Sequence, residues 1–406
     1  MNGVREVESQ FFEFGSCDGP FKLESGATLS RVRLAYETYG RLSPERDNAV
    51  LVFHALTGSQ HAAGVNTNVE NNPLWTDECH AGWWDGFIGP GKALDTGKYF
   101  VVCINYIGGC YGSTGPGSIE PEAGRPYGSR FPDITVGDIV RSQIRLLDHL
   151  GIEKLLAVTG GSMGGMLAMD LAVQFPERVQ LVVPIASGVR VPNLTRVHNF
   201  EQLFALQEDP NFNRGDYYGG PQPYQGLVLA RMIGHKTFVS LDLMHERAKG
   251  HVVQANGDLK GYRMRHQIES YMLHQGKKFS KRFDANSYVK ILTAWQSFDL
   301  ARSYGDGNIV EAFGPSAEAK HRYFIFSIDS DVCFWPEEQF EIVDAIKRAG
   351  IDHRYVTVHS EKGHDSFLLE PELYTPILSY LLDEELIRAR ADALRTGQVP
   401  LVTPEI

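Results

Sequence analysis

The chain has 406 residues, of which 43% are hydrophobic and 22% charged, and its formal net charge is −11. This composition is ordinary for a globular protein with a sizeable core, and an acidic balance without a Lys- and Arg-rich stripe argues against nucleic acid as a partner. The charged N-terminal stretch lacks the apolar core of a signal peptide, and no run approaches the roughly 18 apolar residues of a membrane span. We therefore expect a cytoplasmic protein without membrane contact. Five scattered cysteines without a C-x-x-C pattern favour reduced thiols over a disulfide framework or a zinc site.

Strand and helix patterns alternate along the first half of the chain. Residues 20–40 alternate polar and apolar and predict an outer strand, whereas the apolar runs 50–53 and 99–104 predict buried strands. A long Gly-, Ser- and Pro-rich loop follows, and then Thr135 and Asp138 form a capping-box pattern at the start of a helix. This alternation predicts an α/β fold with a mostly parallel, doubly wound sheet.

The next stretch, 155–179, has the sequence LLAVTGGSMGGMLAMDLAVQFPERV. An apolar run predicts a buried strand, and apolar residues at helical spacing predict a helix that begins just after Ser162. Gly160, Ser162 and Gly164 form G-x-S-x-G, in which small residues allow a turn too sharp for bulkier side chains. The serine hydroxyl would then stand at a helix N-terminus, where free N–H groups favour negative charge. We interpret Ser162 as a nucleophile.

The pattern changes after the next buried strand. Residues 188–301 are rich in Arg, His, Gln, Tyr and Met, show amphipathic helical patterns and contain no buried strand run. We expect a helical lid inserted into a core made of residues 1–187 and 302–406, where the strand and helix pattern returns. The last twelve residues predict a loose tail.

A serine nucleophile needs a base, and the base needs an acid that fixes its tautomer. In α/β-hydrolases these residues follow in the order Ser, Asp, His, each just after a strand. Asp331 follows the predicted strand YFIFSI, and His364 follows YVTVH. Asp329 is the competing acid, but it lies closer to the strand, so we predict a triad of Ser162, Asp331 and His364.

Two backbone N–H groups are candidates to bind an oxyanion. Met163 follows the nucleophile, and Leu56 lies in the loop after a buried strand, which supplies the second donor in α/β-hydrolases. His54 and His61 share this loop, and we expect them to support its shape. No H-E-x-x-H pattern is present, so no metal is implied.

Seven stretches resemble, in order and spacing, the motifs of the homoserine O-acyltransferases, which are α/β-hydrolase-fold enzymes. They are HALTGSQHAAG, GWWDGFIGPGKALDT, YFVVCINYIGGCYGSTGP, VTGGSMGGM, GLVLARMIGHKTF, IESYMLHQGKKFSKRFDANSYV and KGHDSFL. The resemblance implies transfer of an acyl group from acyl-CoA to L-homoserine through an acyl-serine, a step toward methionine. It also implies that Arg231 binds the amino acid's carboxylate, that Asp365 binds its ammonium, and that two chains form a homodimer through the lid. Acetyl-CoA would be a co-substrate, without a resident cofactor.

Alternatives stay open for the acceptor, for the donor and for the type of function. Phe238 replaces a tyrosine that is usual in the family, so serine is a second possible acceptor. Succinyl-CoA is a second possible donor, although the GGCYGSTGP and SMGG stretches look more like those of acetyl-using members. The same fold could also serve an ester or thioester hydrolase, or a protein that binds without catalysis.

Overall fold

A computed structural model describes residues 6–16, 19–251, 259 and 261–396. Eight strands form one sheet in the order β1-β4-β6-β5-β9-β10-β11-β12. The bounds of these strands are β1 (Gln10–Phe14), β4 (Val32–Tyr39), β5 (Ala49–Phe53), β6 (Phe100–Ile104), β9 (Leu155–Gly161), β10 (Val179–Ile185), β11 (Arg322–Ile328) and β12 (Asp352–Val358). The six strands from β6 to β12 in this order run parallel, while β4 pairs antiparallel with β6 and with β1. The mostly parallel sheet is as predicted, but the edge strand β1 was not anticipated.

Both faces of the sheet are covered, which explains why its central strands are mostly apolar. In β5, Leu51 and Phe53 contribute to one hydrophobic core, whereas Val50 and Val52 contribute to the other. Two short antiparallel pairs lie outside this sheet. They are β2 (Phe21–Lys22) with β3 (Thr28–Leu29), and β7 (Ile119–Glu120) with β8 (Arg125–Pro126).

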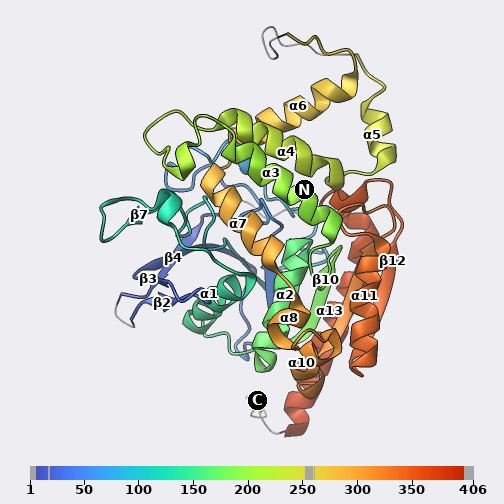
Figure 1. Ribbon diagram of the computed structural model, residues 1–406. Helices are drawn as coiled ribbons and strands as arrows, with labels where there is room; N and C mark the ends of the chain where they lie inside the picture. The colour runs from blue at the N-terminus through green and yellow to red at the C-terminus, as the bar shows by residue number, and fades with distance from the viewer. Residues whose placement is uncertain (1–5, 17–18, 252–258, 260, 397–406) are drawn as a thin grey trace.

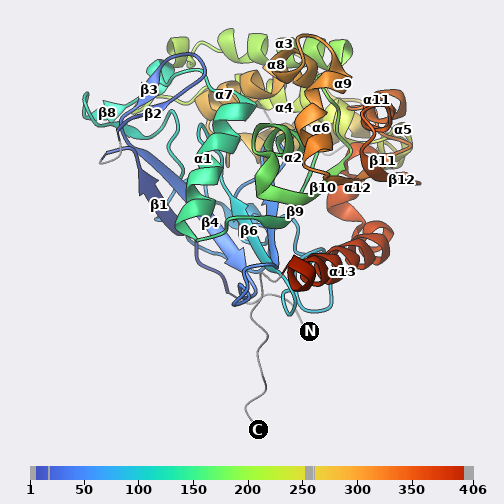
Figure 2. The same cartoon turned by 90° about the horizontal axis from the view of Figure 1, so that it is seen from below.

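Helices pack on the two faces in the doubly wound manner (Figure 2). One face carries α1 (Val136–His149), α2 (Met163–Gln174) and α11 (Pro336–Arg348), and the opposite face carries the long α13 (Pro371–Thr396). The predicted capping box is present at α1, where Thr135 Oγ1 accepts from the Asp138 N–H and an Asp138 carboxylate oxygen accepts from the Thr135 N–H. A short helix, α12 (Ser366–Leu369), precedes α13.

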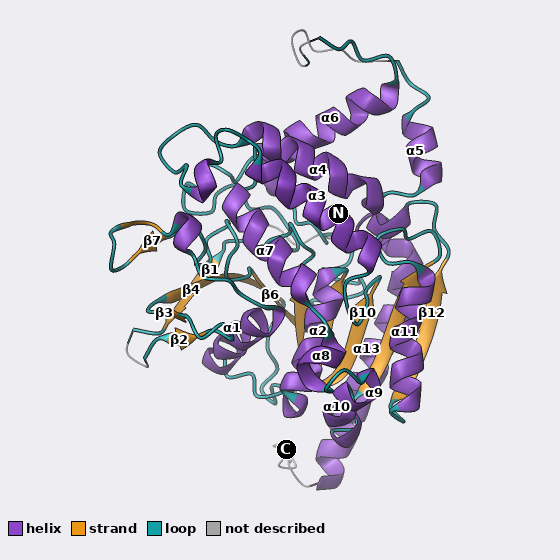
Figure 3. Ribbon diagram, viewed as in Figure 1, coloured by secondary structure: helices purple, strands orange, loops and turns teal. Residues whose placement is uncertain are grey.

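The segment between β10 and β11 is helical, as expected for the lid, and Figures 1 and 3 show α3, α4 and α6 gathered at one end of the molecule. Helix α4 contacts α3, α6 and the turn Gly363–Asp365 that follows β12. The proposed boundary at residue 301 lies inside α8, and α10 contacts α2. The helices of this segment are α3 (Asn193–Gln207), α4 (Tyr224–Phe238), α5 (Leu241–Arg247), α6 (Gln267–Ser280), α7 (Ala285–Ser297), α8 (Leu300–Tyr304), α9 (Ile309–Ala312) and α10 (Gly314–Glu318).

The described residues also form five 3-10 turns. They are η1 (Asp77–Cys79), η2 (Gly128–Arg130), η3 (Pro176–Arg178), η4 (Asn213–Gly215) and η5 (Gly363–Asp365). Within the described ranges, no helix is both long and apolar enough to span a membrane. The first two residues of the predicted tail, 395 and 396, belong to α13 rather than to a loose tail, and residues 397–406 lie outside the described ranges.

Candidate active site

Ser162 lies at the junction between β9 and α2, as its motif predicts. Its φ is 59° and its ψ is −124°, a backbone conformation that is strained for a residue with a side chain. The flanking glycines allow this turn to pack closely against the end of β5. A Cβ on Gly160 would lie 2.7 Å from the Phe53 carbonyl oxygen, and one on Gly164 would lie 2.4 Å from the same atom. The close approach of two backbones therefore explains the small residues of G-x-S-x-G.

Asp331 and His364 form a buried pair at the carboxyl edge of the sheet. The Nδ1 atom of His364 lies 2.7 Å from Oδ2 of Asp331, while Oδ1 of Asp331 accepts hydrogen bonds from the N–H groups of Cys333 and Phe334. Burial opposes protonation of the imidazole, but the charge and hydrogen bond of Asp331 outweigh it, so the pKa of His364 is raised above its ordinary value. The Nε2 atom of His364 is buried and has no hydrogen-bond partner among the described residues.

The competing acid Asp329 has other partners. Its carboxylate lies 2.7 Å from Nδ1 of His359 and accepts from the N–H of Ser360, and this pair is far more exposed than the pair of Asp331 and His364. The structure therefore joins His364 to Asp331, the acid favoured from chain order.

The phenyl ring of Phe367 packs against Gly161, the residue before Ser162, and against the imidazole of His364. A Cβ on Gly161 would lie 2.3 Å from Cε2 of Phe367, and the centroid of this ring is 5.5 Å from that of His364. Ser162 and His364 are both buried. Of the strands that precede the three predicted triad residues, β11 and β12 are neighbours in the parallel sheet, and only β10 lies between β9 and β11. The three residues predicted as nucleophile, base and acid therefore all follow strands at the same carboxyl edge of the sheet.

The two expected oxyanion donors lie on elements that pack against each other. Gly164 contacts the backbone of Phe53 and His54, where the loop that carries Leu56 begins. This loop turns tightly, with the Gly58 N–H donating to the Ala55 carbonyl oxygen at 3.0 Å. Neither the Leu56 N–H nor the Met163 N–H donates to any acceptor within the described part of the chain. Both groups are therefore available to an external oxyanion.

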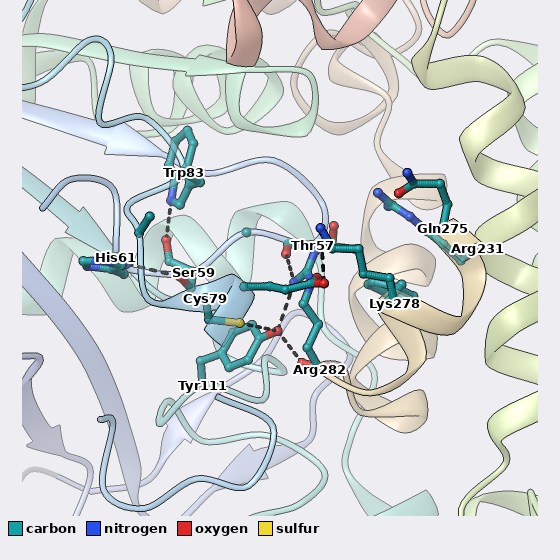
Figure 4. A pocket seen from close by; sticks show the side chains of 14 residues that line it. Thr57, Ser59, His61, Cys79, Trp83, Tyr111, Arg231, Gln275, Lys278 and Arg282 are labelled. Atoms are coloured by element: carbon teal, nitrogen blue, oxygen red, sulfur yellow. Dashed lines mark hydrogen bonds and ion pairs between the residues drawn. The ribbon is translucent and has the colours of Figure 1, made fainter. Parts of the chain in front are cut away.

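Arg231 lines a cavity of about 230 Å³ formed between the lid and the loops after the sheet strands (Figure 4). Its guanidinium carbon lies 5.0 Å from the ring centroid of Phe238 and 5.0 Å from that of Phe279. Its Nε is buried without a hydrogen-bond partner, and it forms no ion pair with any described residue. Burial and the positive charge of Arg282 lower the pKa of Arg231. A half-buried cation without an acid partner favours an anionic ligand.

Asp365 supplies the opposite charge next to His364. Burial raises the pKa of its carboxyl group to about 6, although the positive charges of His364 and Arg231 act in the opposite direction. Asp365 forms no ion pair with the residues that the structure describes. Arg231 and Asp365 thus offer a cation and an acid, neither in an ion pair with a described residue, and this combination suits a zwitterion.

Arg282 is a further residue of this site, and no role was predicted for it, although it lies in one of the seven stretches that resemble the family motifs. Arg282 lines the same cavity, and its Nη1 donates to the Thr57 carbonyl oxygen at 3.3 Å and to the Tyr111 hydroxyl at 3.1 Å (Figure 4). The stretch KKFSKRFDANSYV could have pointed to Arg282 as a site residue. Its sequence does not indicate which residues Arg282 contacts. Lys278 also lines the cavity and pairs with Glu78 at 3.2 Å.

His61 and Phe238 also have defined places. Both ring nitrogens of His61 face acceptors, with Nδ1 2.8 Å from Glu37 and Nε2 3.0 Å from the His80 carbonyl oxygen, which fits a role in loop shape. The ring of Phe238 is 6.3 Å from that of His364. The tyrosine-to-phenylalanine difference noted in the sequence therefore lies at the site itself.

The fold and this site define an α/β hydrolase, and residues 48–371 match the family described as the alpha/beta hydrolase fold. A homoserine O-acetyltransferase from Deferribacter desulfuricans is 44% identical over 385 residues, which cover 94% of this chain and 97% of that protein. The chain therefore belongs to the homoserine O-acetyltransferase family, a family of acyltransferases, and the fold and family expected from the sequence are confirmed.

Solved structures agree with this assignment. The structure of homoserine O-acetyltransferase from Bacillus anthracis has a TM-score of 0.81 at 27% identity and covers 94% of this chain and 98% of its own. Esterase E22 has a TM-score of 0.79, also at 27% identity, and covers 93% of this chain and all of its own. The same scaffold is thus found in proteins named as acyltransferases and as esterases.

Proposed function

We propose that this protein transfers an acetyl group from acetyl-CoA to the hydroxyl of L-homoserine, as the names of its relatives indicate and as expected for methionine biosynthesis. The observation that carries the proposal is the guanidinium of Arg231, which forms no ion pair with a described residue. Its carbon lies 5.0 Å from the ring centroid of Phe238, and that ring lies 6.3 Å from the ring of His364. The buried pair of His364 and Asp331 serves the acyl-transfer chemistry. Arg231 favours an acceptor that carries a carboxylate, such as an amino acid.

In the first half-reaction, Ser162 Oγ attacks the thioester carbonyl while Nε2 of His364 takes its proton. The N–H groups of Leu56 and Met163 bind the oxyanion of the tetrahedral intermediate. Collapse breaks the carbon–sulfur bond, and the departing thiolate receives the proton from His364. The products are free CoA and an acetyl ester on Ser162.

In the second half-reaction, the acceptor hydroxyl attacks the acetyl-serine ester while His364 takes the hydroxyl proton. A second oxyanion forms at the same two N–H groups, and its collapse returns the proton to Ser162 Oγ. Asp331 keeps the proton of the neutral imidazole on Nδ1, so that Nε2 is the basic atom, and it stabilises the imidazolium that forms in both halves. The residues of this chain thus perform the reaction with acetyl-CoA as co-substrate and without a resident cofactor or metal.

The acceptor is bound through its two charges. Arg231 pairs with the carboxylate and Asp365 with the ammonium, so binding neutralises two groups that lack partners among the described residues. Phe238 provides an apolar ring where the family usually provides a hydroxyl. Homoserine is the acceptor that the family predicts, and serine is one methylene shorter.

A steady-state comparison tests donor and acceptor together. Acetyl-CoA and succinyl-CoA are each combined with homoserine and with serine, and the formation of free thiol and of the O-acyl amino acid is measured. We expect the highest kcat/KM for acetyl-CoA with homoserine. A preference for succinyl-CoA would instead indicate that Arg282, a second cation of the cavity without an ion pair among the described residues, binds the distal carboxylate of the succinyl group.

Hydrolysis is the second candidate because the structure of esterase E22 is similar over nearly the whole chain. Water would then replace homoserine in the second half-reaction. Thiol release from acetyl-CoA is measured with and without homoserine. Release that continues at the same rate without the amino acid would show a hydrolase, whereas a single-turnover burst followed by homoserine-dependent release is expected for transfer.

We also propose that two copies form a homodimer through the lid. Helices α3 and α4 pack together and expose several large apolar side chains, which are Leu194, Val197, Phe200, Phe204 and Leu229. Phe200 and Phe204 are 62% and 55% exposed, so a second copy would remove apolar area that is costly in water. Analytical ultracentrifugation of the wild type and of Phe200→Glu tests this. A wild-type monomer at micromolar concentration would contradict the proposal.

We also propose that the protein resides in the cytoplasm. The four cysteines that the structure describes are all free, which fits a reducing compartment. Fractionation of cells that express the full chain, followed by assay of each fraction, is the direct measurement.

A further inference from the structure

The imidazole of His54 lies directly behind the peptide group that carries the Leu56 N–H. Its Nδ1 atom is 2.7 Å from the Ala55 carbonyl oxygen, which also accepts the Gly58 N–H at 3.0 Å. A carbonyl oxygen only accepts, so Nδ1 carries a proton. Burial lowers the pKa of His54 to about 4, and the ring is therefore neutral near pH 7.

The direction of the Leu56 N–H follows from this contact. In a trans peptide group the N–H points opposite to the C=O of the same group. Two hydrogen bonds hold the Ala55 carbonyl toward the imidazole and the Gly58 amide, so the Leu56 N–H points away from both. The Leu56 N–H donates to nothing else in the described structure. Hydrogen bonds accepted by the carbonyl also polarise the amide and strengthen the N–H as a donor.

His54 is itself held rigidly in place. Its ring stacks on Tyr106 with centroids 3.6 Å apart and planes 19° apart, and the Tyr106 hydroxyl donates to the His54 carbonyl oxygen. Gly58 makes room on another side, since a Cβ there would lie 2.8 Å from Cβ of His54 and 3.1 Å from Nδ1. These contacts fix the imidazole of His54, and its Nδ1–H in turn holds the Ala55 carbonyl oxygen in one position.

We propose that His54 is a positioning residue for oxyanion binding, and that its Nδ1–H sets the direction and donor strength of the Leu56 N–H. The proposal rests on the acyl-serine chemistry proposed above. It assigns no contact with substrate to His54. The effect is expected on formation and breakdown of the acyl-enzyme, because the oxyanion forms in both steps, and not on binding of homoserine.

Two substitutions distinguish this role from simple packing. The side-chain amide of asparagine places an N–H near the position of Nδ1, whereas that of glutamine reaches the position of Nε2. His54→Asn is therefore expected to keep most of the acylation rate, and His54→Gln to lose about 10- to 100-fold, which is less than or equal to the loss of a whole oxyanion donor. The rate of thiol release in the burst with acetyl-CoA is measured, together with the KM for homoserine and the melting temperature.

Gly58→Ala gives a second route that leaves the imidazole chemically intact. The added methyl would displace His54 from the Ala55 carbonyl, so the same slowing of acylation is expected with an unchanged KM for homoserine. This variant also keeps the proposal testable where His54→Gln fails to fold.

The proposal is overturned where asparagine and glutamine at position 54 slow acylation equally, where neither slows it, or where Gly58→Ala acylates at the wild-type rate. Failure of the proposed function has a different signature, namely no homoserine-dependent transfer by the wild type. In that event the burst of p-nitrophenol from p-nitrophenyl acetate still ranks the same variants, because any acyl-serine route uses the oxyanion donors.

Discussion

The carboxylate of Asp331 is held on both oxygens, one by backbone N–H groups and the other by Nδ1 of His364 at 2.7 Å. An ionised acid in this position fixes the tautomer of the imidazole, and so leaves Nε2 free to accept a proton. Because Asp331 is almost completely buried, water cannot replace it as a partner.

Asp331→Asn is expected to lower kcat by about 1,000- to 10,000-fold, since an amide in this position favours the wrong tautomer of His364. Asp329→Asn is the matched control, two residues away on the same loop and paired with the exposed His359. It is expected to keep kcat within about threefold of the wild type, because loss of an exposed pair costs little. Steady-state assays and melting temperatures of both variants check this, and a larger loss in the Asp329 variant would assign the acid to that residue instead.

Arg231→Ala is expected to raise the KM for homoserine by about 100-fold or more, which corresponds to a charge-assisted hydrogen-bonded pair of about 3 kcal/mol. The burst of thiol release from acetyl-CoA is expected to be nearly unchanged, because the acceptor is absent from that step. Lys236→Ala on the same helix, with an exposed side chain, serves as the control. Loss of the burst in the Arg231 variant would show that this residue acts on the donor.

Acceptor binding is expected to weaken as the pH falls through about 6. The pKa of Asp365 is raised to about 6, so its carboxylate is ionised above this pH and neutral below it. A neutral carboxyl group loses the attraction to the ammonium of homoserine, so the KM for homoserine should rise toward acid pH. Asp365→Asn should have a high KM at every pH between 5 and 8 and remove this dependence, and a retained dependence would point to another group.

The pH dependence of acylation is expected to reflect a different group, the imidazole of His364. The raised pKa of His364 means that its base form is lost already above the ordinary histidine value of about 6.5 as the pH falls. The burst rate with acetyl-CoA is therefore expected to decline below neutral pH in the wild type and in Asp365→Asn alike. A burst rate that does not change between pH 5 and pH 8 would contradict a base role for His364.

Gly164→Ala is expected to destabilise the fold by about 1–3 kcal/mol and to abolish activity, since its Cβ would lie 2.4 Å from the Phe53 carbonyl oxygen. Gly314→Ala is a matched control, because a Cβ at that glycine meets no atom within 4 Å. Chemical denaturation measures both. Equal stability of the two variants would mean that the elbow can relax away from β5.

The local chemistry of the sequence was sufficient for the strand, turn and helix around Ser162. A buried apolar run, small residues at fixed spacing and a helical repeat all lie within 25 residues of one another. Chain order after predicted strands was enough to rank Asp331 above Asp329. The central strands were also predictable from local sequence, because fully buried parallel strands appear as nearly continuous apolar runs.

Non-local pairings could not be predicted from the sequence. Strand β1 was missed because its strand character depends on pairing with β4, whose paired residues lie 18 to 26 positions further along the chain. The contact of Arg282 with Thr57 joins residues 225 positions apart, and no spacing rule reaches that far. The roles of Arg231 and Asp365 came from family resemblance, and the structure adds that both charges lack partners within its described residues. The support of the Leu56 peptide by His54 required coordinates, because a histidine beside a loop has many possible partners.

The turn that carries His364 and the end of helix α4 are in direct backbone contact. A Cβ on Gly363 would lie 2.4 Å from the amide nitrogen of Ser240, two residues beyond the helix that carries Arg231. The Ser240 N–H also donates to the Lys362 carbonyl oxygen at 3.4 Å, so the end of this helix and the turn that carries His364 have little space between them. An added methyl group at position 363 would therefore push against both segments, and one substitution would disturb the placement of Arg231 and of His364 together.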